Sequence, residues 1–328
     1  MEKKTRWLIK FLVLVTMLGF ARFSSAADYP TKPIECLMPM GPGAVSAIGV
    51  RIITDATAKI LGKPILQVSA LGPGGIVAAR RCAMAKPDGY TILASNSAIH
   101  GTALCTRKDI GYENSDFEFL AFWAFQDMGL TTRPGAPFKT LEEFIAYAKE
   151  NRVKAGLMGV GTGGHMCFEL LKLEIPGLKI DYVPAVSSPD MRMLLLGDNI
   201  DVAILMGGSG GPTDEFTQAI ESGSRVIAVS SKERLKAFPN VPSYSEKGLN
   251  VVLSAWTGIV APKGIPKEVS EKLKNALYKA LEDPQVIQGV EKLGNRYLFM
   301  KSEEFTKYVK EYEDLIRRIV KEAKIPPI

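Results

Sequence analysis

The chain has 328 residues, of which 46% are hydrophobic and 23% are charged, and it is long enough for two domains with cores of their own. Its formal net charge is +6, but the first 26 residues hold five of the 41 basic residues and one of the 35 acidic residues. The remaining 36 basic and 34 acidic residues nearly balance. Nucleic acids require a basic patch that such a chain lacks, so we expect no nucleic-acid partner.

The first 26 residues are organised like a secretory signal peptide. Four basic residues at positions 3–10 precede the apolar run 11–20, which is too short for a comfortable membrane span. Ser24, Ser25 and Ala26 then provide a small-residue cleavage site. We therefore expect cleavage near Ala26 and a periplasmic protein. An uncleaved N-terminal anchor is the alternative.

Cysteine and histidine usage argues against a metal or redox site. The four cysteines, Cys36, Cys82, Cys105 and Cys167, form no C-x-x-C pair, so neither a zinc ribbon nor a thioredoxin motif is supported. Export would permit disulfides, with three possible pairings, but we favour buried free thiols. Only two histidines are present, which disfavours a histidine-rich metal site and a Ser-His-Asp triad. We expect no metal, no cofactor and no catalytic residue.

Strands and helices alternate in the first third of the chain. The predicted strands are residues 34–38, 65–68 and 91–94, and the predicted helices are residues 46–61 and 76–86. The first helix has apolar residues at helical spacing, and Gly62 follows its end. This β-α-β-α-β order is typical of α/β proteins with a parallel, doubly wound sheet.

Three glycine-rich turns follow predicted strands and precede predicted helices. They are residues 41–44 (GPGA), 72–75 (GPGG) and 159–164 (GVGTGG). Such a turn leaves the first N–H groups of the helix unpaired at the positive end of its dipole, which suits an anion. Ligands of doubly wound sheets bind at the carboxyl ends of the strands. The turns therefore predict one small anionic ligand held mainly by backbone amides, although each turn alone could be a simple connection.

Two long apolar stretches, residues 119–131 and 251–261, are predicted to cross between two lobes. Between them we predict strands 155–158, 180–183, 200–206 and 226–229 and helices 140–150, 165–173, 189–196 and 214–221; helices 266–281, 284–293 and 302–322 follow. The expected fold is an α/β, two-lobed periplasmic binding protein of the venus-flytrap type with two crossover strands. Its predicted parts are the signal peptide 1–26, a discontinuous domain 1 of residues 27–126 plus 251–328, and domain 2 of residues 127–250.

Short motifs along the whole mature chain match one known family in order and spacing. They are residues 29–34 (YPTKPI), 86–91 (KPDGYT), 139–143 (KTLEE), 161–165 (GTGGH), 196–201 (LGDNID), 239–242 (PNVP), 254–258 (SAWTG) and 261–262 (AP). On these motifs the chain resembles the substrate-binding proteins of tripartite tricarboxylate transporters, the Bug family.

The resemblance implies a periplasmic, non-enzymatic protein that binds a small carboxylate in the inter-lobe cleft and delivers it to the membrane permease subunits of such a transporter. We also expect a monomer. Backbone amides, hydroxyls and ordered water would hold the ligand. The implied contacts from the first lobe are Met40, Gly43, Ala44, Val45, Ser46, Ala47, Gly74, Gly75, Ser95 and Asn96. Those from the second lobe are Gly161, Thr162, His165, Ala185, Ser187, Met206 and Gly207.

Two departures from the family pattern bear on the ligand. Family members commonly read G-G-x-x-D in the first loop, whereas residues 43–47 here are GAVSA, so Ala47 stands at the acidic position. The family's Tyr-Lys-Gly after Val-Pro is replaced by Ala185, Val186 and Ser187. Without the acid, the bulky wall and the cation, the pocket is more neutral. We expect a carboxylate that lacks an amino group and carries an apolar or aromatic body.

Three alternatives belong to other functional classes. Residues 159–164 fit the dinucleotide-binding pattern G-x-G-x-x-G, with Asp181 further along, which would suit a nucleotide-dependent oxidoreductase. A hydrolase could use His165 or Ser209, but the chain has no G-x-S-x-G motif. A ligand sensor without a transport role would need the same cleft as a transport receptor.

Overall fold

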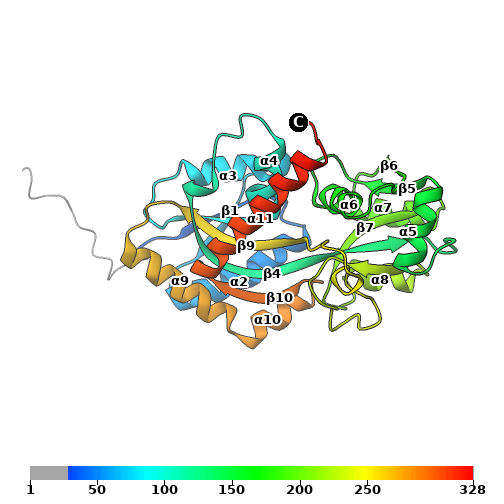
Figure 1. Cartoon of the computed structure of the whole chain (residues 1–328). Coiled ribbons are helices and arrows are strands. Elements are labelled where there is room, and N and C mark those ends of the chain that lie inside the picture. Colours follow the sequence, from blue (N-terminus) through cyan, green and yellow to red (C-terminus); the bar gives the residue numbers. More distant parts are fainter. Residues whose placement is uncertain (1–28, 328) are drawn as a thin grey trace, which may run out of the picture.

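The computed structural model describes residues 29–327. The predicted signal peptide lies outside the described residues. Figure 1 shows an α/β molecule of two lobes joined by extended chain, which confirms the predicted fold class. Among residues 29–327, no helix combines the length and apolar character needed to cross a membrane.

A mixed sheet runs through both lobes. Its path is β2 (Ile65–Ser69), β1 (Ile34–Met38), β3 (Thr91–Asn96), β9 (Ser254–Pro262), β4 (Phe117–Thr132), β7 (Val202–Gly207), β5 (Val153–Leu157) and β6 (Ile180–Pro184), with β10 (Arg296–Lys301) and β8 (Arg225–Val229) also paired to β4. We call β1, β2, β3, β9, β10 and the first half of β4 lobe one, and β5 to β8 with the second half of β4 lobe two. Each lobe contains three parallel strands, and this arrangement had been predicted for lobe one.

Strand β4 belongs to both lobes. Its first half pairs with β9 and β10 and its second half with β7 and β8, and Figure 1 shows it passing from one lobe to the other beside β9. The predicted crossing at residues 119–131 is therefore confirmed. The second crossing is made by residues 251–253 and the start of β9, so the strand begins three residues later than predicted. The assignment of residues to two domains stays a prediction.

Helices cover both faces of the lobe-one sheet. On one face lie α2 (Val45–Leu61), α9 (Lys267–Leu281) and α10 (Pro284–Glu291); on the other lie α3 (Ile76–Ala83), the short α4 (Ala103–Thr106) and α11 (Ser302–Glu322). Trp123 of β4 packs under α2 against Gly49, where a Cβ would lie 2.9 Å from the indole ring. Trp256 of β9 is buried under α11, with its ring centroid 5.2 Å from that of Phe305. Both indoles are core residues.

Lobe two repeats the layered arrangement on a smaller scale. Helices α5 (Leu141–Glu150) and α6 (Gly163–Glu174) contribute to the same core as α11, whereas α7 (Ser188–Leu196) and α8 (Glu215–Glu221) pack on the other side. Helix α6 also packs against α11, so the two lobes share apolar contacts beyond the crossings. The four cysteines are free, with Cys36, Cys82 and Cys167 buried, as predicted. Burial raises the pKa of Cys36 to about 12.

The remaining sequence predictions were mostly right for element type and less so for ends. Gly62 ends α2 in the left-handed region, with φ +69°, as a glycine after a helix should. Thr140 caps α5 by accepting the Glu143 N–H at 3.2 Å. The helix predicted over 76–86 ends at Ala83, three residues earlier than predicted. Pro87 disfavours helical backbone only at the preceding residue, Lys86. The strand β10 and the helical turns at residues 98–106 were not predicted.

Candidate functional site

Strand direction brings two sets of loops to face each other. Strand β3 and the first half of β4 are both antiparallel to β9, so β1, β2 and β3 run, like β4, toward lobe two. Strand β7 is antiparallel to the second half of β4, so β5, β6 and β7 run toward lobe one. The carboxyl ends of both parallel sets therefore meet beside the crossing strands. This is the place where doubly wound sheets bind ligands.

The turn after β1 leaves the start of α2 open. Ala44 is the N-cap residue, with extended backbone and no side-chain hydrogen bond, and the first turn of the helix has no acidic residue. The next two amides, of Val45 and Ser46, lie in the first helical turn, where no carbonyl four residues earlier is available within the helix. A Cβ at Gly41 or Gly43 would meet nothing within 4 Å. This turn is an accessible cluster of N–H groups at the positive end of a helix.

The other lobe-one predictions lie close to this turn. Gly75, with φ +79°, fits tightly, since its Cβ would lie 3.2 Å from Pro39 Cβ and 2.8 Å from Ile99 Cγ1. The N–H of Ala70 donates to the carbonyl of Met38 at 2.9 Å. The structure thus brings the turn 72–75 between the loops that follow β1 and β3. Met40 is half-buried and Ala47 is buried against the core under α2.

Ser95 and Asn96 occupy the last two positions of β3. The Asn96 side chain is used locally, because its Oδ1 accepts the N–H groups of Ala98 at 3.0 Å and Ile99 at 3.2 Å. The Ser95 hydroxyl is buried without a partner among the described residues. The same holds for the hydroxyl of Thr257, which pairs with Asn96 across β3 and β9. Sequence reasoning missed Thr257, a single hydroxyl residue between Trp256 and a run of apolar positions, at the cleft end of β9.

In lobe two, the buried side chain of His165 bonds to the backbone of the glycine turn at residues 159–164. Its side chain is only 7% exposed, and its Nδ1 accepts the N–H of Gly161 at 3.3 Å. Burial lowers the pKa of His165, although Glu169 opposes the effect. The neutral ring therefore carries its proton on Nε2, which lies 3.6 Å from Glu169 Oε1. Thr162 caps α6, accepting the His165 N–H at 3.4 Å and donating to the Gly159 carbonyl at 2.8 Å.

The turn after β6 presents a different residue from those predicted. Ala185 is buried, and Ser187 caps α7 by accepting the Asp190 N–H at 3.2 Å. The carboxylate of Asp190 accepts the N–H of Val186 at 2.9 Å. The side chain that faces solvent is Val186, which is 90% exposed. The available sequence signal was an apolar residue in the short loop between the end of β6 and Ser187, the cap of α7.

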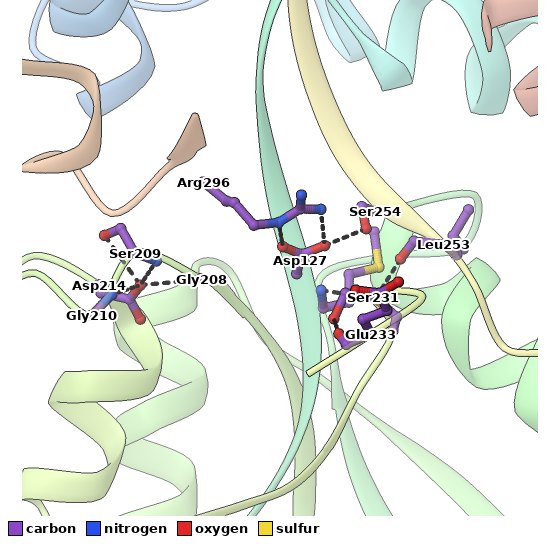
Figure 2. A network of polar contacts seen from close by, with 12 residues as sticks. Asp127, Gly208, Ser209, Gly210, Asp214, Ser231, Glu233, Leu253, Ser254 and Arg296 are labelled. Atoms are coloured by element: carbon purple, nitrogen blue, oxygen red, sulfur yellow. Dashed lines mark hydrogen bonds and ion pairs between the residues drawn. The ribbon is translucent and has the colours of Figure 1, made fainter. Parts of the chain in front are cut away.

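The turn after β7 is occupied by the chain itself. Asp214 Oδ2 accepts the N–H groups of Gly208 at 2.7 Å, Ser209 at 2.8 Å and Gly210 at 3.1 Å, as Figure 2 shows. Its other oxygen accepts the Phe216 N–H at 2.8 Å at the start of α8. The Met206 N–H donates to Glu215 Oε2 at 2.9 Å, and burial raises the pKa of that carboxyl group. Beside Met206 and Gly207, the carboxylate of Asp214 therefore accepts the backbone N–H groups that an anionic ligand would need.

Hollows of about 560, 470 and 310 Å³ lie outside the predicted contacts. The first is on lobe one, around Glu118 and Lys274. The other two are both lined by Arg296 of lobe one and by Lys232 of lobe two. None of the three includes a residue that the sequence had indicated as a ligand contact.

The geometry of residues 159–164 argues against a dinucleotide site. The acidic residue of that pattern, Asp181, is the second residue of β6 and pairs with Lys154 in the register of β5 and β6. It therefore lies near the amino end of its strand, away from the glycine turn. Both of its oxygens bond to Arg152, at 2.7 Å each. Asp181 is not placed to bind a ribose at the carboxyl end of the sheet.

Comparison with known proteins decides the family. The model of the tripartite tricarboxylate transporter family receptor, TctC, matches residues 50–325. The chain belongs to this family. A UPF0065 protein of Agrobacterium vitis is 31% identical over 287 residues, covering 86% of this chain and 81% of that protein. The family is one of solute-binding receptors, which confirms the resemblance that the sequence motifs indicated.

Solved structures of similar proteins agree with the fold. MatC of Rhodopseudomonas palustris, determined with bound malate, is 26% identical with a TM-score of 0.71, covering 89% of this chain and 100% of that one. An R. palustris protein determined with adipate is 22% identical with a TM-score of 0.77, covering 92% and 100%, and shows likeness in fold.

Proposed function

We propose that this protein is the periplasmic receptor of a tripartite tricarboxylate-type transporter. It captures a small carboxylate between its lobes and delivers it to the membrane permease subunits. The observation that carries this proposal is the open start of α2, where Ala44 provides no side-chain cap and the first turn has no acid. The likeness to malate-bound MatC over nearly the full length supports it.

The binding chemistry follows from this open helix start. A carboxylate can accept the free N–H groups of the first turn and is stabilised by the helix dipole, as anions at helix starts are. The turn at residues 159–164 of lobe two faces it, with Thr162 and His165 fixing the backbone. Closure of the lobes would bring the second set of amides onto the ligand and exclude water.

The neighbourhood of the helix start indicates which carboxylate. Ala47 is 2% exposed and stands where family members commonly carry an acidic residue, so this loop has no carboxylate to pair with an ammonium group. In lobe two, the exposed Val186 after β6 adds an apolar surface. A ligand ammonium would thus be desolvated beside the positive end of a helix with no counter-charge, which is unfavourable. The preferred ligand is a carboxylate without an amino group.

Matched ligand pairs test both parts of the proposal. We would first release and identify any co-purified molecule by mass spectrometry of the natively purified mature protein. Thermal-shift and calorimetric titrations would then compare succinate with aspartate and glutarate with glutamate, with malate as reference. A ligand at 100 times its dissociation constant should stabilise the fold by about 2.7 kcal/mol. Tighter binding of the amino acids would refute the ligand class, and binding of NAD without any carboxylate response would refute the receptor function.

A further inference from the structure

A buried ion pair lies where β4 passes from lobe one to lobe two. Asp127 is the last residue of β4 that pairs with β9, opposite Ser254, and the first that pairs with β7, opposite Gly207. Its carboxylate is fully buried. Figure 2 shows that it accepts both the guanidinium of Arg296, at 2.9 Å for the Nη2–Oδ1 bond, and the Ser254 hydroxyl at 2.6 Å. Both partners belong to lobe one.

The next residues along the chain are held from the other side. Ser230, which follows β8 in lobe two, is fully buried. Its hydroxyl accepts the Met128 N–H at 3.0 Å and donates to the Leu253 carbonyl at 2.6 Å. Its backbone bonds to the same two residues, at 2.8 Å to the Met128 carbonyl and 3.2 Å from the Leu253 N–H. One lobe-two serine thus holds both crossing chains.

We infer that the lobes turn about two peptide links, Asp127–Met128 and Leu253–Ser254. Asp127, Arg296, Ser254 and Ser230 form what we call the hinge network. A buried carboxylate that loses its partners is strongly destabilised, so the chain up to Asp127 moves with lobe one. The bonds to Ser230 make Met128 and Leu253 move with lobe two. Rotation is thereby confined to one link in each crossing, and the lobes approach along a defined path.

Space for this rotation exists beside Arg296. The guanidinium lies 4.6 Å from the Phe125 ring centroid, and Arg296 lines both the hollow of about 470 Å³ and that of about 310 Å³. Each hollow is lined by Arg296 from lobe one and by Ser231 and Lys232 from lobe two. Since packed interiors yield little, hollows with one wall on each lobe are where relative movement can be accommodated.

Distance measurement in the ligand-free protein tests the hinge network directly. Spin labels at Glu268→Cys in lobe one and Lys149→Cys in lobe two, both exposed positions, would be placed in a Cys105→Ser background. Double electron–electron resonance then gives the distribution of inter-lobe distances. The test variant is Asp127→Asn. The control is Asp201→Asn. Like Asp127, Asp201 bonds an arginine, but its two partners, Arg133 and the backbone N–H of Lys154, both lie in lobe two.

We expect both variants to lower the thermal midpoint and only Asp127→Asn to broaden the distance distribution. An unchanged distribution in Asp127→Asn would overturn the inference. If that variant does not fold, Ser230→Ala serves instead, because it keeps every charge and removes only the hydroxyl bonds; the same broadening is expected. No ligand is needed, so failure of the hinge network is distinguishable from failure of the proposed function.

Ligand titration adds a second readout, which rests on the proposed function. With malate as probe, we expect Asp127→Asn to weaken binding about threefold, because a looser hinge must lose more conformational freedom on closure. Asp201→Asn should leave the dissociation constant unchanged. Equal weakening in both variants would show that Asp127 contributes only general stability.

Discussion

Two glycine-rich turns at the ends of parallel strands use their amides in opposite ways. The turn at residues 207–211, between β7 and α8, encloses the carboxylate of Asp214, which accepts N–H groups from three successive residues. The turn at residues 41–44, between β1 and α2, has Ala44 at the corresponding cap position and encloses no side chain. A glycine-rich turn is therefore available to an anion only where the following helix does not supply its own carboxylate.

The two remaining turns, at residues 159–164 and 72–75, are supported by side chains without a charge. At residues 159–164 the acceptor is the neutral imidazole of His165, which takes one N–H. At residues 72–75 the turn is shaped by packing against Pro39 and Ile99. The four turns thus differ in the side chains that support them. A carboxylate serves residues 207–211, a neutral ring serves residues 159–164 and apolar contacts serve residues 72–75, whereas Ala44 supplies no side-chain cap at residues 41–44.

The largest effect on stability is expected from removing the Asp214 carboxylate from the turn at residues 207–211. Asp214→Ala removes the helix cap and leaves buried N–H groups unpaired, so we expect the free energy of unfolding to fall by about 3 kcal/mol. Asp283→Ala is the matched control, because Asp283 caps α10 at an exposed site with a 2.8 Å bond to the Gln285 N–H and no glycine turn. Its loss should cost about 1 kcal/mol. Denaturant unfolding measures both, and equal losses would contradict the role given to the turn.

The second largest effect on stability is expected from disturbing the close packing at Gly75. At Gly75 a side chain is opposed both by the left-handed backbone, φ +79°, and by the Cβ contacts with Ile99 and Pro39. We expect Gly75→Ala to destabilise the fold by about 2 kcal/mol in thermal unfolding. Gly62→Ala is the control, with a similar φ of +69° and no atom within 4 Å of its Cβ. If the two variants lose the same stability, backbone strain alone accounts for the effect.

A carboxylate introduced at residue 44 should occupy the turn at residues 41–44 as Asp214 occupies the turn at residues 207–211. Ala44→Asp places a carboxylate at the cap of α2, where the backbone is already extended. We expect the protein to gain about 1 kcal/mol of stability and malate binding to weaken at least about tenfold, or 1.4 kcal/mol. Ala44→Ser supplies a cap without a charge and should stabilise without abolishing binding. Unchanged malate affinity in Ala44→Asp would place the ligand elsewhere.

The smallest effect is expected from the protonation of His165, the neutral acceptor in the turn at residues 159–164. Because the folded-state pKa of His165 is lowered, the stability from its neutral form is complete above the ordinary value near pH 6.5 and is lost as the pH falls toward the lowered pKa. Protonation of Nδ1 also removes the acceptor for Gly161. Glu169 and the Tyr182 ring contact the same histidine, and Lys172 forms an ion pair with Glu169. We expect malate affinity to fall on acidification below pH 6.5.

The pH effect must be separated from protonation of the ligand. His165→Gln cannot titrate and should show only the part of the pH dependence that the ligand itself causes. The difference between wild type and variant, measured by calorimetry from pH 5 to pH 8, isolates the histidine. Identical profiles would show that His165 does not control the turn.

Much of the fold could be predicted because local patterns and tertiary packing agree. Strand β1 and helices α2 and α11 lie within one residue of their predicted bounds, since their apolar spacing matches the faces they bury. Strand β10 was missed because nothing in residues 296–301 alternates clearly; it is extended because it pairs with β4, far away in the sequence. Such pairing is not visible in a local window.

The candidate site was less predictable than the fold. The open turn at residues 41–44 was indicated correctly as a glycine turn before a helix, but the same pattern at residues 207–211 is occupied by Asp214. An aspartate at the start of a predicted helix was the available signal. His165 and Ser187 were expected to contact a ligand, and both make structural hydrogen bonds within lobe two. Whether a polar residue faces its own backbone or a ligand depends on side-chain direction, which composition does not specify.

The two crossings also bear on the order in which the chain folds. The bond from Ser254 to Asp127 spans 127 residues, and closing such a loop in an unfolded chain has an entropic cost that grows with its length. Lobe two contains nearly all of that loop, and its ends, Met128 and Leu253, bond to the same serine. Once lobe two has folded, the separated parts of the lobe-one sheet become neighbours. Lobe one, whose core is covered by α11 at residues 302–322, can then be completed only when the last part of the chain has been made.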